Sequence, residues 1–284
     1  MTAGAATARI AGEHPEARPW LALVERALAA GRDREWQAAV RASPTPRDPR
    51  APRLAGAAFR LDRGTVRRWL AELAAAAGGR AGDVARVDGL ALLEAALTLD
   101  GPRLVRLAGE AGGEPAAFRA LAEVAGLPLL LAAGRRWAAH VPPTWWEGYC
   151  PVCGAWPLLA EDRGVERARR LRCGRCAADW AGEWLRCAFC GTREHGRLGT
   201  LVPASGGERR KVETCAACGG YLKCVTTLTG TPAAELLFAD VATTDLDVSA
   251  LAAGYRRPEG AGWPLAVTVA ERPGLARRLL GPAA

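Results

Sequence analysis

The fold is decided by four pairs of cysteines, which read YCPVCG at 149–154, LRCGRC at 171–176, LRCAFCG at 185–191 and ETCAACGG at 213–220. Two residues between the cysteines of a pair let a tight turn aim both sulfurs at one metal ion. A glycine follows three of the four pairs and permits the backbone conformation that closes such a turn. Because a tetrahedral site needs two turns, the sequence predicts two metal sites with four thiolates each.

The spacing of the pairs favours grouping them in sequence order. The intervals between pairs are 19, 10 and 24 residues, and the first lies in the usual window for a four-cysteine ribbon. An interleaved arrangement, first pair with third and second with fourth, stays open. The predicted metal ligands are Cys150, Cys153, Cys173 and Cys176 at one site and Cys187, Cys190, Cys215 and Cys218 at the other.

A site closed by four cysteines is usually structural, because it leaves no open position for a substrate or a water molecule. Zinc and iron both accept four thiolates, and the spacing does not choose between them. Turns that end in glycine are more typical of mononuclear ions than of iron–sulfur clusters. Disulfides are the weaker interpretation, because the cysteine count of nine is odd and the first residues do not resemble a secretory signal.

The other reactive side chains point to no catalytic machinery. Cys224 lies in the apolar run YLKCVTTL and is expected to be a buried free thiol. His195 is expected in a loop, because four cysteines already complete the neighbouring site. No serine or cysteine triad and no recognisable carboxylate pair is present, so we predict a protein that is not an enzyme, without catalytic or organic-cofactor-binding residues.

The chain changes character near residue 143. Before it, apolar residues recur at helical spacing, as at 20–28 and 66–73, and Thr65 is a candidate N-cap. Further helices are expected at 89–99, 103–108, 115–125 and 128–139. After residue 143, short apolar runs between glycine-containing turns indicate strands, which are expected at 156–160, 168–172, 199–202, 211–213 and 221–227.

We therefore predict an α+β fold in four segments. These are an all-α helical domain (1–143), two four-cysteine metal-binding β modules of rubredoxin or zinc-ribbon type (144–186 and 187–230), and a short C-terminal helix and tail (231–284). The helix is expected at 246–255.

Composition argues against a membrane and against nucleic acid as partners. No apolar run approaches the roughly 18 residues that span a bilayer, so a soluble cytoplasmic protein is expected. The net charge of the chain is +8, and residues 144–230 carry a formal +4 from 13 Lys or Arg and 9 Asp or Glu. Eight thiolates with two divalent ions would add −4 and bring the charge of this region to about zero. A nucleic-acid-binding ribbon would need a contiguous stripe, for which the candidates are Arg163, Arg167, Arg169, Arg170 and Arg172, and acidic residues interrupt it.

The cysteine series as a whole resembles the FdhE family of formate dehydrogenase accessory proteins. The resemblance includes Trp180 beyond the second pair, the run ETCAACGGYLK, and LDVSALAAGY at 246–255, and it extends from about Cys150 to Tyr255. Two positions depart from the family pattern. Trp184 stands where an arginine is expected, and Cys224 replaces an aliphatic residue.

This resemblance implies a cytoplasmic, non-enzymatic accessory or maturation factor needed to assemble active molybdenum- or tungsten-dependent formate dehydrogenase. It implies binding to the unfinished catalytic subunit, and mononuclear iron in rubredoxin-like sites held by the eight paired cysteines. The alternatives are a nucleic-acid-binding zinc ribbon protein and a thiol or redox transfer protein that uses its metal sites. Exposed tryptophans often anchor interfaces, so we also expect some of Trp145, Trp146 and Trp184 to be exposed.

Overall fold

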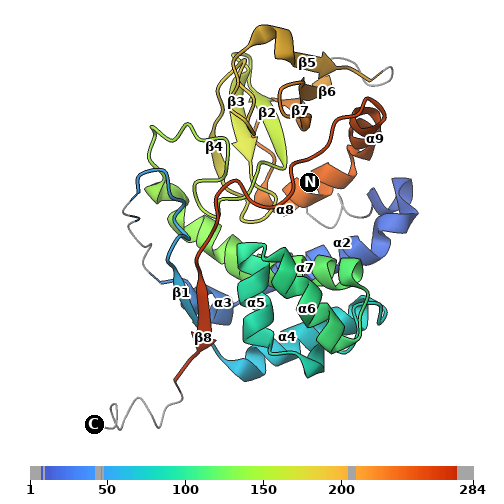
Figure 1. Ribbon diagram of the computed structural model, residues 1–284, viewed down its shortest axis with the longest axis vertical. Helices are drawn as coiled ribbons and strands as arrows, with labels where there is room; N and C mark the ends of the chain where they lie inside the picture. The colour runs from blue at the N-terminus through green and yellow to red at the C-terminus, as the bar shows by residue number, and fades with distance from the viewer. Residues whose placement is uncertain (1–7, 9, 42–45, 47, 204–208, 274–284) are drawn as a thin grey trace.

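The computed structural model describes residues 8, 10–41, 46, 48–203 and 209–273. A helical part lies below a β-sheet in Figure 1, and the last described segment runs from the sheet back along the helices. The mixed helix and strand architecture confirms the predicted α+β class. The helices of the first part are α2 (Arg18–Ala30), α3 (Arg34–Ala39), α4 (Arg63–Ala76), α5 (Gly89–Thr98), α6 (Gly101–Ala111) and α7 (Pro115–Trp137), with 3-10 turns η1 (Pro15–Ala17), η2 (Val84–Arg86) and η3 (Ala138–His140).

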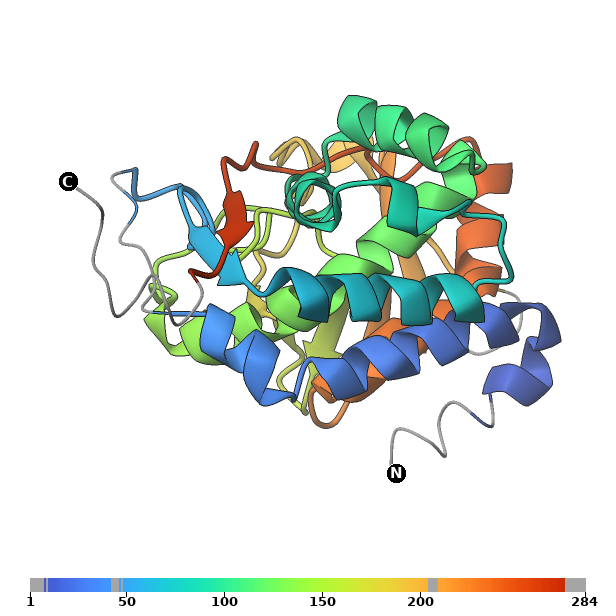
Figure 2. The ribbon, with the colours of Figure 1, turned by 90° about the horizontal axis from the view of Figure 1, so that it is seen from below.

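Helix α7 is the core of the helical part. It contacts α2, α3, α4, α5 and α6, and Figure 2 shows it running behind α4 between the other helices. The prediction of two helices separated before Pro128 is wrong, because one helix runs through this proline. A proline inside a helix costs about 3 kcal/mol, but here Leu127, Pro128 and Leu129 are all buried, so packing on every side opposes a break.

The length of α7 also corrects the expectation that no apolar segment could span a bilayer. Pro115–His140 is long and apolar enough by composition, with a mean hydropathy of 1.6. However, 72% of that window is buried inside the protein. The apolar character of α7 is therefore that of a core helix packed among other helices.

Aspartate side chains cap the N-termini of three of the α-helices. The Asp62 side chain accepts a hydrogen bond from the Thr65 amide at 2.8 Å, so the cap of α4 is Asp62 and the prediction of Thr65 is wrong. Asp88 and Asp100 cap α5 and α6 in the same way. A carboxylate at this position satisfies an amide that has no partner within the helix.

The two cysteine-rich regions share one six-stranded sheet. The strands are β2 (Leu159–Arg163), β3 (Ala168–Arg172), β4 (Asp179–Ala181), β5 (Leu198–Leu201), β6 (Arg210–Cys215) and β7 (Gly220–Thr227), and η4 (His195–Arg197) precedes β5. Their order is β4-β3-β2-β7-β6-β5. Neighbours are antiparallel except β2 and β7, which pair in parallel and join one antiparallel unit to the other. The five predicted strands lie within three residues of β2, β3, β5, β6 and β7, whereas β4 was not predicted.

The C-terminal region returns to the start of the chain. Helices α8 (Ala233–Val241) and α9 (Thr244–Ala252) come first, where the sequence predicted one helix at 246–255. Strand β8 (Thr268–Glu271) then pairs in parallel with β1 (Ala58–Leu61), and neither strand was predicted. The division into four segments remains a prediction, and the last residues of the tail lie outside the described residues.

Candidate metal centres

The structure gathers the eight paired cysteines into two clusters, in sequence order. Within each cluster all four Sγ atoms lie within 4.8 Å of one another. The Sγ–Sγ distances are 3.4 Å for Cys150–Cys176 and 3.7 Å for Cys187–Cys218. A tetrahedron with metal–sulfur bonds of about 2.3 Å has edges of roughly 3.8 Å, so both donor sets fit a single zinc or iron ion. The first cluster is Cys150, Cys153, Cys173 and Cys176, and the second is Cys187, Cys190, Cys215 and Cys218.

Each pair of cysteines forms the same turn. The amide four residues after the first cysteine donates to the carbonyl of that cysteine, as from Gly154 to Cys150 at 2.9 Å. The residue that donates has a positive φ in all four turns, and three of the four are glycines. The fourth is Ala177, with a φ of 59°, which explains why one pair lacks the glycine signal. The four residues are Gly154, Ala177, Gly191 and Gly219.

The first cluster is fully enclosed. All four of its cysteines are buried, and burial raises the pKa of the Cys150 and Cys176 thiols well above its usual range. Four thiolates cannot be kept together in such a place without positive charge, because desolvation and mutual repulsion both favour the neutral thiols. A bound cation removes this conflict, since a coordinating thiol loses its proton.

The first cluster also connects the helices to the sheet. Gly134 of α7 lies so close to the turn that an added Cβ would be 2.0 Å from the carbonyl oxygen of Cys176. The Arg175 guanidinium donates to the Leu97 carbonyl at the end of α5 at 3.2 Å. The amide of Leu54 donates to the carbonyl of Val152 at 2.9 Å. These contacts place the first centre at the junction of the two halves.

The second cluster is open on one side. Cys190 and Cys218 are exposed, whereas Cys187 and Cys215 are buried. Partial burial raises the pKa of the Cys218 thiol to about 11, so a cation is needed here as well to hold four thiolates at neutral pH. The two centres thus share a ligand set and differ in their access to solvent.

The arginine stripe that a nucleic-acid-binding ribbon would need is not a free cationic surface. Arg172 is buried and donates to Glu161 at 2.7 Å. Arg169 is buried and forms a bidentate pair with Glu213. Arg163 pairs with Glu161 and Asp179, and Arg170 also pairs with Asp179. Of the five candidates only Arg167 is exposed, so the acidic residues that interrupt the stripe neutralise most of it.

The expectations for Cys224 and for the exposed tryptophans are confirmed. Cys224 is a buried free thiol, and burial raises its pKa. Trp146 and Trp184 are 51% and 45% exposed, whereas Trp145 is buried. His195 is exposed in η4 and belongs to neither cluster.

A buried charge cluster was missed at the sequence level. Lys223 of β7 has no exposed side-chain surface and lies 2.7 Å from Asp247 of α9. Asp247 also accepts a hydrogen bond from the Tyr221 hydroxyl at 2.8 Å and from Arg257 at 2.9 Å. Burial opposes the charge on Asp247, but these donors hold its pKa below its usual value. The only sequence feature that pointed to this cluster was the Leu246-Asp247 pair at the start of the segment 246–255.

Known FdhE proteins are similar in sequence to part of this chain. Residues 185–261 match the family model described as FdhE, C-terminal domain. An FdhE homolog of Aquifex aeolicus is 31% identical over 118 residues, and one of Stutzerimonas stutzeri is 38% identical over 111 residues. These matches cover 40% and 38% of this chain and 41% and 35% of the relatives, so they span less than half of the relatives' length.

The fold has a solved counterpart. The crystal structure of the FdhE protein from Pseudomonas aeruginosa aligns with a TM-score of 0.54 at 24% identity, over 92% of this chain and 94% of that one. This likeness extends to the helical half, which the matched family model at 185–261 does not include. The family model and the relatives confirm the resemblance to the FdhE family for part of the chain, and the solved structure shows a shared fold.

Proposed function

We propose that the protein is a non-enzymatic accessory factor for the assembly of active formate dehydrogenase, on the basis of the resemblance of its C-terminal region to the FdhE family. Its client is the unfinished catalytic subunit of a molybdenum- or tungsten-dependent enzyme, and it acts in the cytoplasm. The observation that carries the proposal is the match of residues 185–261 to the FdhE C-terminal domain, which includes the second cysteine cluster.

The two centres favour a structural role, as a rigid platform for a partner, over a catalytic one. Each cluster offers four cysteine sulfurs, and four ligands leave no coordination position for a substrate. Among the residues that the structure describes, these are the only groups of side chains placed to hold a metal ion. We propose that each cluster binds one mononuclear zinc or iron ion, which fixes the turns and the strands that follow them.

The proposal is tested by deleting the gene in its native host and measuring formate oxidation. Loss of activity with normal amounts of the catalytic subunit, restored by the wild-type gene, is the expected result. The purified protein should also bind the catalytic subunit that accumulates without its cofactor, and bind the finished enzyme less tightly. Normal formate oxidation in the deletion strain would rule out the proposed function.

The exposure of Cys190 and Cys218 gives a redox or thiol-transfer role some support as a second candidate. Metal analysis after anaerobic purification, followed by a redox titration, separates the two functions. Iron with a reversible potential would favour the redox role. Zinc would exclude electron transfer at the metal, because it has no accessible redox chemistry.

A further inference from the structure

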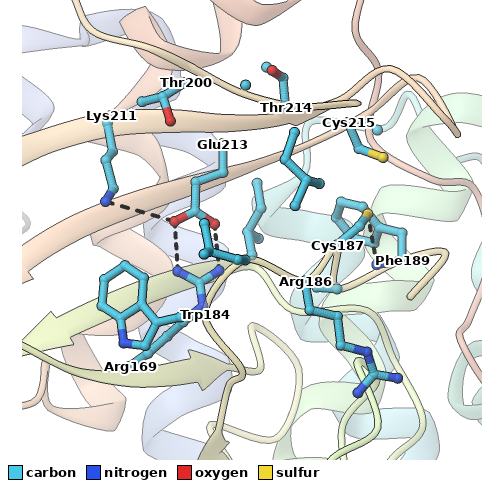
Figure 3. A pocket seen from close by; sticks show the side chains of 16 residues that line it. Arg169, Trp184, Arg186, Cys187, Phe189, Thr200, Lys211, Glu213, Thr214 and Cys215 are labelled. Carbon is cyan, nitrogen blue, oxygen red and sulfur yellow. Dashed lines mark hydrogen bonds and ion pairs between the residues drawn. The ribbon is translucent and has the colours of Figure 1, made fainter. Parts of the chain in front are cut away.

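One face of the sheet is hollow between β5 and β7. The opposite face is covered, because Val212 and Tyr221 pack there against Leu246 and Ala250 of α9. On the open face a hollow of about 220 Å³ lies between the strands and the segment 184–189. Figure 3 shows Lys211 and Glu213 projecting from β6 toward Arg169 and Trp184 across this hollow, which we call the groove.

The charged residues of the groove neutralise one another. The Glu213 carboxylate accepts from Arg169 at 2.6 Å and lies 3.9 Å from the Lys211 ammonium (Figure 3). Lys211 is also 3.2 Å from the buried Asp162 carboxylate. Arg186, the third cation that lines the hollow, lies 3.5 Å from the Glu183 carboxylate, so each cation of the groove already has a carboxylate partner. A charged group that entered the groove would lose its water without gaining a free counter-ion, so the groove favours an uncharged occupant.

The rim of the groove is apolar and partly exposed. Trp184 and Leu185 are exposed at one wall, and Phe189, Leu198 and Leu222 also line the hollow. The Trp184 ring lies 5.4 Å from the Arg169 guanidinium and 5.3 Å from the Lys211 ammonium. These cation–π contacts fix the ring while one side stays open. An exposed tryptophan that is already ordered loses little entropy on binding and suits an interface anchor.

The wall opposite Trp184 is β5, and no described strand pairs with its outer edge. Strand β5 is the last strand of the sheet. The carbonyl of Arg197 faces β6, where it accepts from the Ala216 amide at 2.8 Å. Because backbone groups alternate sides along a strand, those of Leu198 and Thr200 point away from β6. An extended segment could pair with them there, as in recognition by strand addition.

We propose that the groove docks an extended, uncharged apolar segment of the client polypeptide. One large apolar side chain of this segment enters the hollow against Trp184, and the backbone pairs with the outer edge of β5. The assignment rests on the proposed function, because it takes the unfinished catalytic subunit as the client. A folded enzyme keeps apolar segments of this kind in its core, so the groove distinguishes unfinished from finished clients.

The test compares two exposed tryptophans. Trp184→Ala removes the anchor, and Trp146→Ala is the matched control, because Trp146 is exposed to a similar extent and does not line the groove. The purified metal-loaded proteins are titrated with the catalytic subunit made without its cofactor. We expect Trp184→Ala to weaken binding about 10- to 100-fold and Trp146→Ala to change it by less than about threefold. Metal content and circular dichroism should be unchanged in both.

A second pair of variants tests the strand edge. Thr200→Pro removes an amide that faces away from β6, whereas Thr200→Ala keeps it. The proline variant should bind the client at least about tenfold more weakly than the alanine variant. Equal affinities would overturn the strand pairing.

The remaining outcomes separate this inference from the proposed function. If the wild type binds the client and Trp184→Ala binds equally well, the groove assignment is wrong and the accessory role stands. If the wild type does not bind the client, both fail. Self-association of the wild type that is lost in Trp184→Ala would make the groove a contact between copies, and would overturn the client assignment.

Discussion

Asp247 joins the C-terminal helices to the sheet. Its carboxylate lies among Lys223, Tyr221 and Arg257, and Lys223 is shielded from solvent entirely. A buried cation without its partner costs far more than a surface ion pair gains. The sequence indicated a helix and a family resemblance at 246–255, and the structure adds a physical role for Asp247 within this segment.

Replacing Asp247 with alanine should therefore lower the free energy of unfolding by roughly 2–4 kcal/mol, because Lys223 keeps only Asp240 and the Tyr221 hydroxyl loses its acceptor. Asp245→Ala is the control on the same helix. Asp245 pairs with Arg210 at the surface, so its loss should cost less than about 1 kcal/mol. Urea unfolding of the metal-loaded proteins measures both. Equal losses would show that the burial of Lys223 adds nothing.

At the scale of elements, helical spacing and cysteine spacing were sufficient to place most of the structure. The strand at 168–172 was predicted to the residue, because short runs between turn residues leave little choice. The joining of α7 through Pro128 and the pairing of β1 with β8 were not predictable. Both depend on segments far apart in the sequence, since β1 and β8 lie about 210 residues from each other.

The same limit applied to the candidate sites. The eight cysteines were visible because each turn carries its own local signature, with Ala177 the one irregular member. The groove was not visible, because Arg169, Trp184 and Glu213 come from three separate segments. Alternation along a strand identifies a face, but only the strand order shows which face another element leaves uncovered.

The contact of α7 with the first metal turn can be tested at one glycine. Gly134→Ala would place a Cβ 2.0 Å from the carbonyl oxygen of Cys176, and both groups are backbone-bound and cannot turn aside. We expect a loss of roughly 1–3 kcal/mol in the free energy of unfolding, with weaker retention of metal at the first centre.

Gly109→Ala is the matched control for this substitution. Gly109 lies in α6 with open space at the Cβ position, so alanine should stabilise the helix by up to about 1 kcal/mol. Thermal unfolding and metal content of the two variants measure the difference in stability and in metal retention. A Gly134→Ala protein as stable as Gly109→Ala would mean that α7 does not fix the first centre.

At the scale of the whole molecule, the two centres have unequal surroundings. The first lies where the helices, the sheet and the returning C-terminal segment meet, since the Trp263 amide donates to the Gly154 carbonyl at 3.0 Å. The second lies where β6 ends and β7 begins, beside the groove, because Cys187 and Cys215 line that hollow. We infer that the first ion holds the fold together and that the second shapes a binding surface.

This difference predicts two phases when the metal-loaded protein is treated with excess chelator. The second centre should lose its ion first, because Cys190 and Cys218 are open to solvent, and circular dichroism should change little. The first centre should release its ion only as the protein unfolds, because all four of its ligands are buried. Metal release and circular dichroism, followed in the same sample, measure the two phases.

Serine variants assign the phases to their centres. Cys190→Ser with Cys218→Ser should give a folded protein that holds one ion and lacks the fast phase. Cys150→Ser with Cys153→Ser should give a protein that fails to fold, because the buried cluster then lacks two thiolates for its ion. A single phase in the wild type, or a folded protein without the first centre, would contradict the division of roles.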